Sequence, residues 1–365
     1  MFASTVVSWE RLRVALGGPA LRFSIFPDTN TTKHILINSK YKFSIADGLL
    51  AGCKEEVPPC TLHSDKDAIH FADAVVWNPR WMGPIGKPPD SKRKGQRWLF
   101  NFFFEAAVYR NKKVSQSTTL KLAHDMDWTM TYDAHSDFFQ PYNQLAKRDT
   151  ILPNYDENMA TNKSMLLVAF ISNCKGVRIS IFKSIREALP MEERHRVKIF
   201  GKCAEKGDVN PCPNRKDVAC MDRVFRTVKF YFAAENSWCK GYITEKFFRG
   251  YEHDMVPLAV GGFGREDYEF LAPGSSFLHL DDFTSAEMLA KRLLELDRDD
   301  EAYSQMFHWR ATHVFQHARV RYGQGICELC AELHLEKKLQ RPERKFKNLD
   351  HWWYEGRCRP QSTFR

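Results

Sequence analysis

Two series of short apolar runs, separated by one polar stretch, constrain the fold of this chain most strongly. In the first half, HFADAVVW, RWLFNFFFEAA and WTMTY have the length and apolar character of buried strands. In the second half, MLLVAFIS, VKIFG, VKFYFAA, MVPLAVGG and SFLHLDD do the same. The polar residues 145–164 are the best candidate linker. We therefore predict an α/β protein of two facing, doubly wound domains with a binding cleft between them.

The predicted boundaries follow these runs. The chain has 365 residues, which exceeds the usual size of a single core. We place the first domain at residues 1–155, the second at 156–325, and a C-terminal segment that returns to the first domain at 326–365. A helix is expected through residues 182–189, and apolar residues at helical spacing predict one long amphipathic helix over residues 285–306.

Charge narrows the choice of partner. The formal net charge is +9, with clusters of Lys and Arg at SKRKGQR and KKLQRPERKFK. Such clusters are usually solvated surface, and no nucleic-acid-binding motif accompanies them, so we expect no nucleic-acid partner. A compact polyanion such as a nucleotide diphosphate needs only a few local cations.

The cysteine content indicates an oxidising compartment. There are ten cysteines, and Cys327 and Cys330 form a CxxC pair that could be half of a zinc site or a redox pair. No second pair at finger spacing accompanies it, so structural disulfides fit better and no metal site is predicted. Two sequons, at Asn30 and Asn162, agree. No signal peptide or membrane span is visible, so either the chain is cytosolic or a targeting segment is missing, which the cysteines favour.

The segment from Phe230 to Tyr268 is the strongest candidate site. The run VKFYFAA is an expected strand, Gly241 breaks the chain, and TEKFFRGYE is an expected helix with Thr244 as its cap. Ligands of α/β folds bind at such strand-to-helix junctions, and a helix start near a lysine suits a phosphate. The alternative is an ordinary solvated connection. The polar residues gathered there are Glu235, Asn236, Ser237, Tyr242, Glu245 and Lys246.

Two further residues are candidates for chemistry. Glu105 ends the apolar run LFNFFFE, a setting that raises a carboxyl pKa and suits a general base, although it could simply mark where the strand meets water. Arg178 follows a buried strand, where it could bind phosphate or lie on the surface. Asp281 and Asp282 could be a metal-binding pair, but a helix cap is preferred.

These motifs together resemble the inverting α1,3-fucosyltransferases. FYFAAENS, GYITEK, VPLAVGG, DYEFLAPGSSFLHLDDF and FHWR are similar in order to the donor-domain signature of that family. Weaker similarities precede them: SNC followed by Arg178, WTMTYDAHSD and FFFEAA. The sequence departs from the family where Asp133-Ala134-His135 replaces an Arg-Arg-Asp run, and in the cysteine-containing insert 203–220.

The resemblance implies a fold, an activity and a set of site residues. The fold would be two Rossmann-like domains of the GT-B type, with the acceptor side in the first and the donor side in the second. GDP-β-L-fucose would donate L-fucose to a GlcNAc hydroxyl of an N-glycan core or a LacNAc-type glycan. Glu105 would be the catalytic base. The donor would be held by Arg178, Asn173, Glu235, Asn236, Ser237, Tyr242, Glu245 and Lys246.

The resemblance also implies that no cofactor is required, with a divalent cation at most stimulatory. It implies a Golgi type II membrane protein whose anchor is absent from this chain, and bonds from Cys53 and Cys60 to Cys327 and Cys330. Two alternatives stay open at this point. One is a protein O-fucosyltransferase acting on Ser or Thr, and the other is a non-catalytic glycan-binding protein of the same fold.

Overall fold

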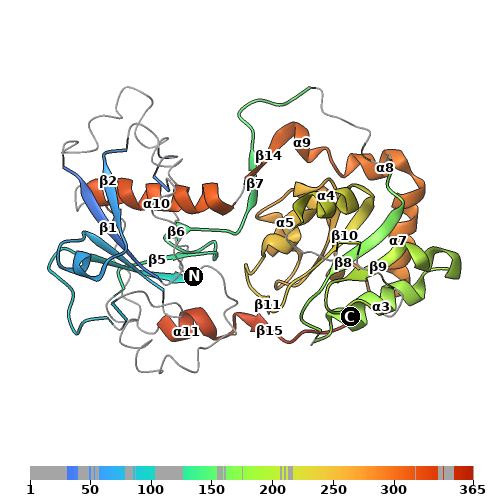
Figure 1. Cartoon of the computed structure of the whole chain (residues 1–365), viewed down its shortest axis with the longest axis horizontal. Coiled ribbons are helices and arrows are strands. Elements are labelled where there is room, and N and C mark those ends of the chain that lie inside the picture. The colour runs from blue at the N-terminus through green and yellow to red at the C-terminus, as the bar shows by residue number, and fades with distance from the viewer. Residues whose placement is uncertain are drawn as a thin grey trace, which may run out of the picture. The chain divides into compact units, whose positions relative to one another are not determined.

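The structure is a computed structural model of the chain, drawn in Figure 1. It describes residues 31–39, 49–50, 53, 57–78, 85–86, 88–102, 126–153, 159, 162–174, 176–205, 208, 211–212, 217–316, 318–335, 340 and 349–364. The chain forms two compact units, the first from the residues up to Pro141 with 318–355, and the second from 142–317 with 356–365.

Unit 1 is built on a six-stranded parallel sheet in the order β2-β1-β3-β4-β5-β6. Apolar side chains of the strands and of helix α10 form its core, including Ile35, Val76, Leu99 and Ile326. The elements are β1 Lys33–Asn38, β2 Cys60–His63, η3 Lys66–His70, β3 Ala74–Trp77, β4 Arg97–Phe102, β5 Trp128–Thr131, β6 Phe138–Phe139, α10 Ala318–His334 and α11 Leu349–Tyr354.

Unit 2 is built on a five-stranded parallel sheet in the order β13-β12-β10-β8-β9. Its strands are β8 Met165–Phe170, β9 Val197–Phe200, β10 Val228–Ala234, β12 Val256–Val260 and β13 Leu278–His279. All seven residues of β10 are buried, as expected for a central strand covered on both faces. Parallel strands with intervening helices agree with the predicted α/β class.

Helices cover both faces of this sheet (Figure 1). On one face Phe182 of α3 packs against Phe232 of β10, and on the other Phe225 of α4 packs against Tyr231. The helices are α3 Arg178–Ala188, η4 Met191–Arg196, α4 Val218–Arg226, α5 Glu245–Glu252, α6 Arg265–Glu269, η5 Gly274–Ser276, η6 Leu280–Asp282, α7 Ala286–Arg298, α8 Asp300–Gln305 and α9 Trp309–Thr312.

The long helix predicted over residues 285–306 is wrong in one respect, because two helices occupy it. Asp299 lies between α7 and α8 in an extended conformation, with φ −121° and ψ 94°. Its carboxylate accepts a hydrogen bond from the N–H of Ala302 and so caps the second helix. An aspartate competes well for such a cap, which the helical spacing of the apolar residues did not reveal.

The positions at which the chain passes from one unit to the other differ from the predicted domain boundaries. Strand β7, Gln144–Lys147, begins at the expected linker and pairs with β14, His313–Gln316, within unit 2. The chain leaves unit 2 before α10 and returns to it after residue 355. There β15, Cys358–Arg359, pairs with β11, Trp238–Cys239, in antiparallel fashion.

Disulfides tie each unit internally. Cys53 bonds to Cys327 and Cys60 to Cys330, which confirms the pairing implied by the family resemblance. Within unit 2 the bonds are Cys174–Cys203, Cys212–Cys220 and Cys239–Cys358. Among the described residues, no helix combines the length and apolar character that crossing a bilayer requires.

Candidate functional site

The candidate donor residues lie in loops and at helix starts at one edge of the unit 2 sheet. Asn173 follows β8, and Glu235, Asn236 and Ser237 follow β10. The loops after β12 and β13, which contain Gly262 and Asp281, end at the same edge because the strands are parallel. Ligands of open α/β sheets bind at this carboxyl edge. The structure thus gathers the sequence-predicted residues of this half in one region of unit 2.

A buried carboxylate anchors the start of helix α5. Glu235 has no exposed surface. Its Oε1 accepts hydrogen bonds from the backbone N–H of Thr244 at 2.7 Å and from the Thr244 hydroxyl at 2.9 Å. Its Oε2 accepts one from Lys246 Nζ at 3.3 Å. Both carboxylate oxygens therefore accept hydrogen bonds inside unit 2, and one of them holds the Lys246 ammonium.

Thr244 connects the two charges. It is the N-cap of α5, as the sequence predicts, and its hydroxyl accepts a hydrogen bond from the Lys246 backbone. The same hydroxyl oxygen lies 2.8 Å from Lys246 Nζ. The ammonium is therefore fixed over the first turn of the helix, where partly positive backbone N–H groups also favour an anion.

The electrostatics keep Lys246 charged. Burial is the largest influence on Glu235 and raises the pKa of its carboxyl above the ordinary value, against the pull of Lys246. Burial also opposes the charged form of Lys246, but the carboxylates of Glu235 and Glu245 outweigh it and raise the pKa of the ammonium. With 22% of its side chain exposed, Lys246 is a protonated cation that solvent can reach.

A second cation lies at the start of helix α3, just after the loop that follows β8. Arg178 is the first residue of α3 and is buried. Its guanidinium donates hydrogen bonds to the side-chain oxygen of Asn236 at 2.7 Å and to the carbonyl of Asn173 at 2.8 Å. These bonds join the loop after β8 to the loop after β10. The spacing of a planar guanidinium suits bidentate contact with phosphate oxygens.

The other predicted donor residues have different surroundings. Tyr242 is buried, and its ring lies 6.1 Å from that of Tyr142 in an edge-on arrangement. Ser237 is buried, whereas Asn236 is exposed. The Glu245 carboxylate is 56% exposed and lies 3.5 Å from Lys246 Nζ. Glu105, the candidate base, lies outside the described residues.

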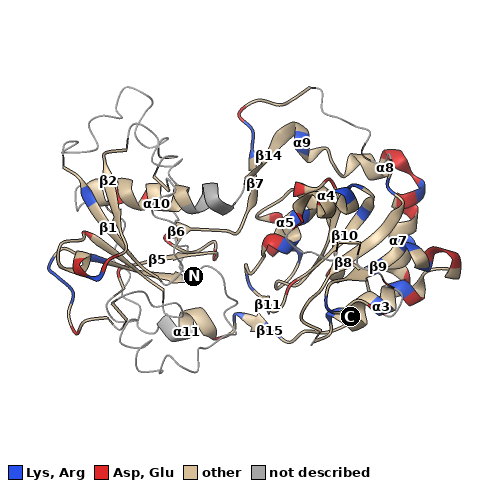
Figure 2. Ribbon diagram, in the orientation of Figure 1, with Lys and Arg blue, Asp and Glu red and all other residues tan. Residues whose placement is uncertain are grey.

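The acidic pair after β13, Asp281 and Asp282, forms hydrogen bonds within unit 2. Asp282 completes a capping box with His279, which agrees with the preferred interpretation as a cap. Asp281 accepts a hydrogen bond from Arg359 at 2.7 Å. Acidic and basic segments are interspersed around helices α7 and α8 (Figure 2). The net positive charge therefore forms no single basic stripe there.

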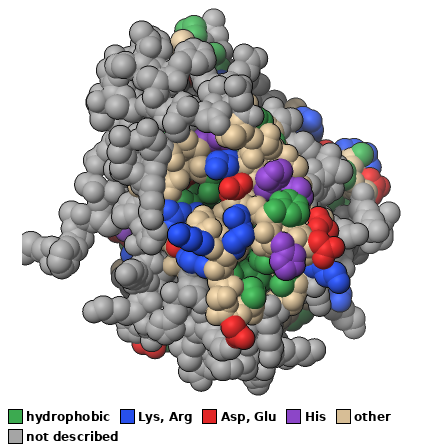
Figure 3. Space-filling view, turned by 90° about the vertical axis from the view of Figure 1, so that its left-hand side faces the viewer, with side chains coloured by type: hydrophobic (Ala, Val, Ile, Leu, Met, Phe, Trp, Pro, Cys, Tyr) green, Lys and Arg blue, Asp and Glu red, His purple; other side chains and the backbone are tan. Residues whose placement is uncertain are grey.

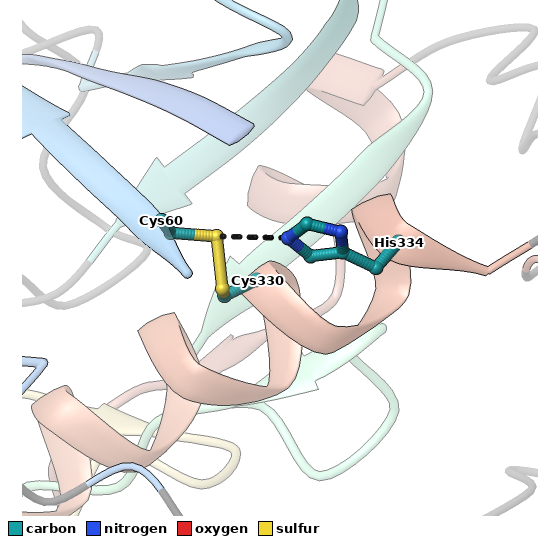
Figure 4. A group of neighbouring side chains, drawn as sticks. All are labelled: Cys60, Cys330 and His334. Atoms are coloured by element: carbon teal, nitrogen blue, oxygen red, sulfur yellow. Dashed lines mark hydrogen bonds between the residues drawn. A yellow bond between two sulfur atoms is a disulfide. The ribbon is translucent and has the colours of Figure 1, made fainter. Parts of the chain in front are cut away.

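One group of potential metal ligands in the described ranges consists of Cys60, Cys330 and His334 (Figure 4). The two sulfurs are joined in a disulfide and so are not thiolate ligands. His334 Nε2 lies 3.1 Å from the carbonyl of Pro59, which fits an N–H donating to it.

A second histidine contact lies on β1 and β2 of unit 1. There His34 Nδ1 lies 3.0 Å from His63 Nε2. The face drawn in Figure 3 carries His side chains beside Lys and Arg.

Three residues that support the candidate donor site were not predicted from the sequence. Asp267 accepts hydrogen bonds from the N–H groups of Gly241 and Phe263, which ties the turn before α5 to the loop after β12. Arg359 and Gln361 reach the same edge from the end of the chain. Gly241 and the partners of Arg359 and Gln361 are distant along the chain, so local sequence patterns do not indicate these contacts.

The fold and this edge define a class: an α/β protein with a site suited to a phosphorylated ligand. The comparisons make the class specific. The model of "Glycosyltransferase family 10 (fucosyltransferase) C-term" matches residues 160–352, and that of "Fucosyltransferase, N-terminal" matches residues 30–143. The chain therefore belongs to glycosyltransferase family 10, the fucosyltransferases, which confirms the family predicted from the motifs.

Individual relatives agree with this assignment. "Glycoprotein 3-alpha-L-fucosyltransferase A" of Drosophila melanogaster is 31% identical over 302 residues, covering 81% of this chain but only 55% of that protein. "4-galactosyl-N-acetylglucosaminide 3-alpha-L-fucosyltransferase FUT6" of Homo sapiens is 30% identical over 352 residues, covering 92% of this chain and 90% of that protein.

A solved structure supports the predicted fold. The "Crystal Structure of alpha1,3-Fucosyltransferase with GDP" aligns with a TM-score of 0.52 and 13% identity, covering 84% of this chain and 92% of that one. At this identity the likeness concerns the fold alone. Together with the parallel sheets of both units, it confirms the expectation of a fucosyltransferase-type α/β fold.

Proposed function

We propose that this protein is an inverting α1,3-fucosyltransferase that moves L-fucose from GDP-β-L-fucose to a GlcNAc hydroxyl. Family membership and the printed activities of the relatives support the reaction. The observation that carries the donor assignment is the Lys246 ammonium, fixed by Glu235 and Thr244 at the start of α5. A protonated lysine at a helix start is a favourable place for the pyrophosphate of GDP.

Each proposed donor residue has a distinct task. Lys246 and Arg178 would stabilise the negative charge that grows on GDP as it leaves. Asn236 and the carbonyl of Asn173 hold the Arg178 guanidinium, so both would orient it. Glu245, Tyr242 and Ser237 lie in the segment between Glu235 and Lys246 and would contact the nucleoside or fucose. We assign Glu235 a positioning task, because its oxygens are already occupied by Thr244 and Lys246.

The chemical step is a single displacement. The acceptor oxygen bonds to the anomeric carbon of fucose as the bond from that carbon to the phosphate oxygen breaks, and GDP departs with the electron pair. Glu105 would take the proton of the acceptor hydroxyl, as the family resemblance implies. No covalent sugar–enzyme intermediate is required, so one carboxylate suffices. Since protein cations serve the leaving group, we expect turnover without an added divalent ion.

The five disulfides support an oxidising compartment, and we propose the Golgi lumen. The deciding experiment is incubation with GDP-fucose and a panel of N-glycan cores, LacNAc-type glycans and folded Ser/Thr-containing domains. Mass measurement and linkage analysis should find fucose in α1,3 linkage to GlcNAc. Transfer to Ser or Thr alone, or binding of glycans without any transfer, would contradict the proposal. Activity that disappears with EDTA and returns with a divalent ion would contradict the metal-independent step.

A further inference from the structure

The last described residues of the chain, 356–364, run along the edge of the unit 2 sheet that holds the candidate donor site. We call them the tail. Strand β15 of the tail pairs with β11, and the Cys239–Cys358 disulfide lies within this pairing. The N–H of Lys240 also donates to the carbonyl of Arg357 at 2.8 Å. The tail is thus bonded to the segment that connects Glu235 to the start of α5.

Arg359 connects three elements at this edge. Its Nε donates to the carbonyl of Gly262 at 2.9 Å, in the loop after β12. Another of its nitrogens donates to Asp281 at 2.7 Å, in the turn after β13. The guanidinium also lies 4.8 Å from the centre of the Trp238 ring in β11. One planar side chain therefore fixes loops that follow different strands.

Gln361 extends the same arrangement to the remaining loops. Its side-chain N–H donates to the carbonyl of Asn236 at 3.0 Å, in the loop after β10. Its side-chain oxygen lies so close to Gly176, in the loop after β8, that a Cβ there would meet it at 2.8 Å. Asn236 in turn accepts a hydrogen bond from Arg178. A chain of contacts therefore leads from the tail to a proposed phosphate-binding residue.

We propose that Arg359 and Gln361 are positioning residues that hold the donor-binding loops in their binding conformation. The inference rests on the proposed function, because it concerns the same nucleotide site. Loops that are ordered beforehand lose less conformational freedom when the ligand binds, so affinity is higher. Arg359 is paired with Asp281, and its contribution is therefore to position loops rather than to supply charge to the nucleotide.

The test compares nucleotide binding in variants of the tail. Arg359→Met and Gln361→Ala should each weaken the calorimetric affinity for GDP by at least about fivefold, the effect expected when an ordered polar contact is lost. The KM for GDP-fucose should rise similarly, with kcat within about twofold of wild type. Arg359→Lys, which keeps the charge but not the planar fork, should restore only part of the affinity.

Two controls separate the proposal from simpler effects. Lys291→Met removes a positive charge from unit 2 at a side chain that is 80% exposed on α7, and it should leave GDP affinity unchanged. Hydrogen exchange without nucleotide should be faster in Arg359→Met at residues 236–246 and 261–264, but not within β10.

The outcomes are distinguishable from those of the proposed function. A wild-type protein that does not bind GDP contradicts the proposed function, while the exchange measurement still reports on the loops. Unchanged exchange in those loops overturns the inference. So does GDP affinity within twofold of wild type in both Arg359→Met and Gln361→Ala.

Discussion

The buried pair of Glu235 and Lys246 gives the sharpest quantitative prediction. Glu235→Gln removes the negative charge but keeps the shape and one acceptor oxygen, and Lys246→Met removes the positive charge but keeps most of the stem. Lys246→Met leaves the Glu235 carboxylate fully buried without its cation, and Glu235→Gln leaves the partly exposed Lys246 ammonium with fewer compensating contacts. The double variant removes both charges at once. A coupling between the two changes therefore measures the interaction directly.

The structure sets the size of the effect. At the observed separation of 3.3 Å, opposite unit charges attract by about 5 kcal/mol with an effective dielectric constant of about 20. Breaking a buried pair from one side typically costs about 3–5 kcal/mol. We expect each single variant to lose about 3 kcal/mol of unfolding free energy. The double variant should lose at least about 2 kcal/mol less than the sum of the singles.

Scanning calorimetry of the four proteins is the assay. For a unit of this size, a loss of about 3 kcal/mol lowers Tm by about 6–12 °C. Glu245→Gln is the matched control, because Glu245 is 56% exposed and its contact with Lys246 is screened by water. It should lower Tm by no more than about 2 °C. Single losses that simply add within about 0.5 kcal/mol would refute the reasoning.

Three further predictions follow from other parts of the chain. Glu105→Gln should lower kcat by about 10²–10⁴-fold and leave calorimetric GDP affinity intact, whereas full activity would remove it as the base. Burial lowers the pKa of Lys163 from 10.5 to about 8, so between these pH values the unfolded chain binds a proton that the folded chain does not. Tm should therefore rise with pH over this range. The rise should be absent in Lys163→Met, and an unchanged slope in that variant would contradict the assignment. The Cys53–Cys327 bridge joins residues 274 apart, but with Cys60–Cys330 intact its removal opens only a short loop. Removing one bridge should therefore lower the free energy of unfolding by about 3 kcal/mol, and removing both should lower it by about 8 kcal/mol. Equal losses for the single and the double variant, measured by calorimetry, would contradict this.

Much of the fold follows from local sequence patterns. The run VKFYFAA forms β10, MLLVAFIS contains β8, and Thr244 caps α5 as expected, because these features depend on neighbouring residues. The end of α7 was missed because the capping aspartate Asp299 interrupts an otherwise continuous apolar spacing. A choice between continuing and restarting a helix depends on local hydrogen bonds that periodicity does not register.

The candidate site was predictable only in part. The residues Glu235 to Lys246 stand together in the sequence, so their gathering at one edge follows from a strand–loop–helix connection. Burial of the Glu235 carboxylate was not predictable, since the pattern only shows a polar residue after a strand. The tail was missed for a different reason: β15 pairs with β11 across 119 residues at the Cys239–Cys358 bond, and such pairing leaves no periodic signal.

A crystal structure with bound GDP tests the central claim most directly. The claim is that cations at the carboxyl edge of the unit 2 sheet bind the pyrophosphate of the donor. The account predicts phosphate oxygens within about 3 Å of Lys246 Nζ and of the Arg178 guanidinium. A nucleotide bound away from the start of α5, with neither cation in contact, would contradict it.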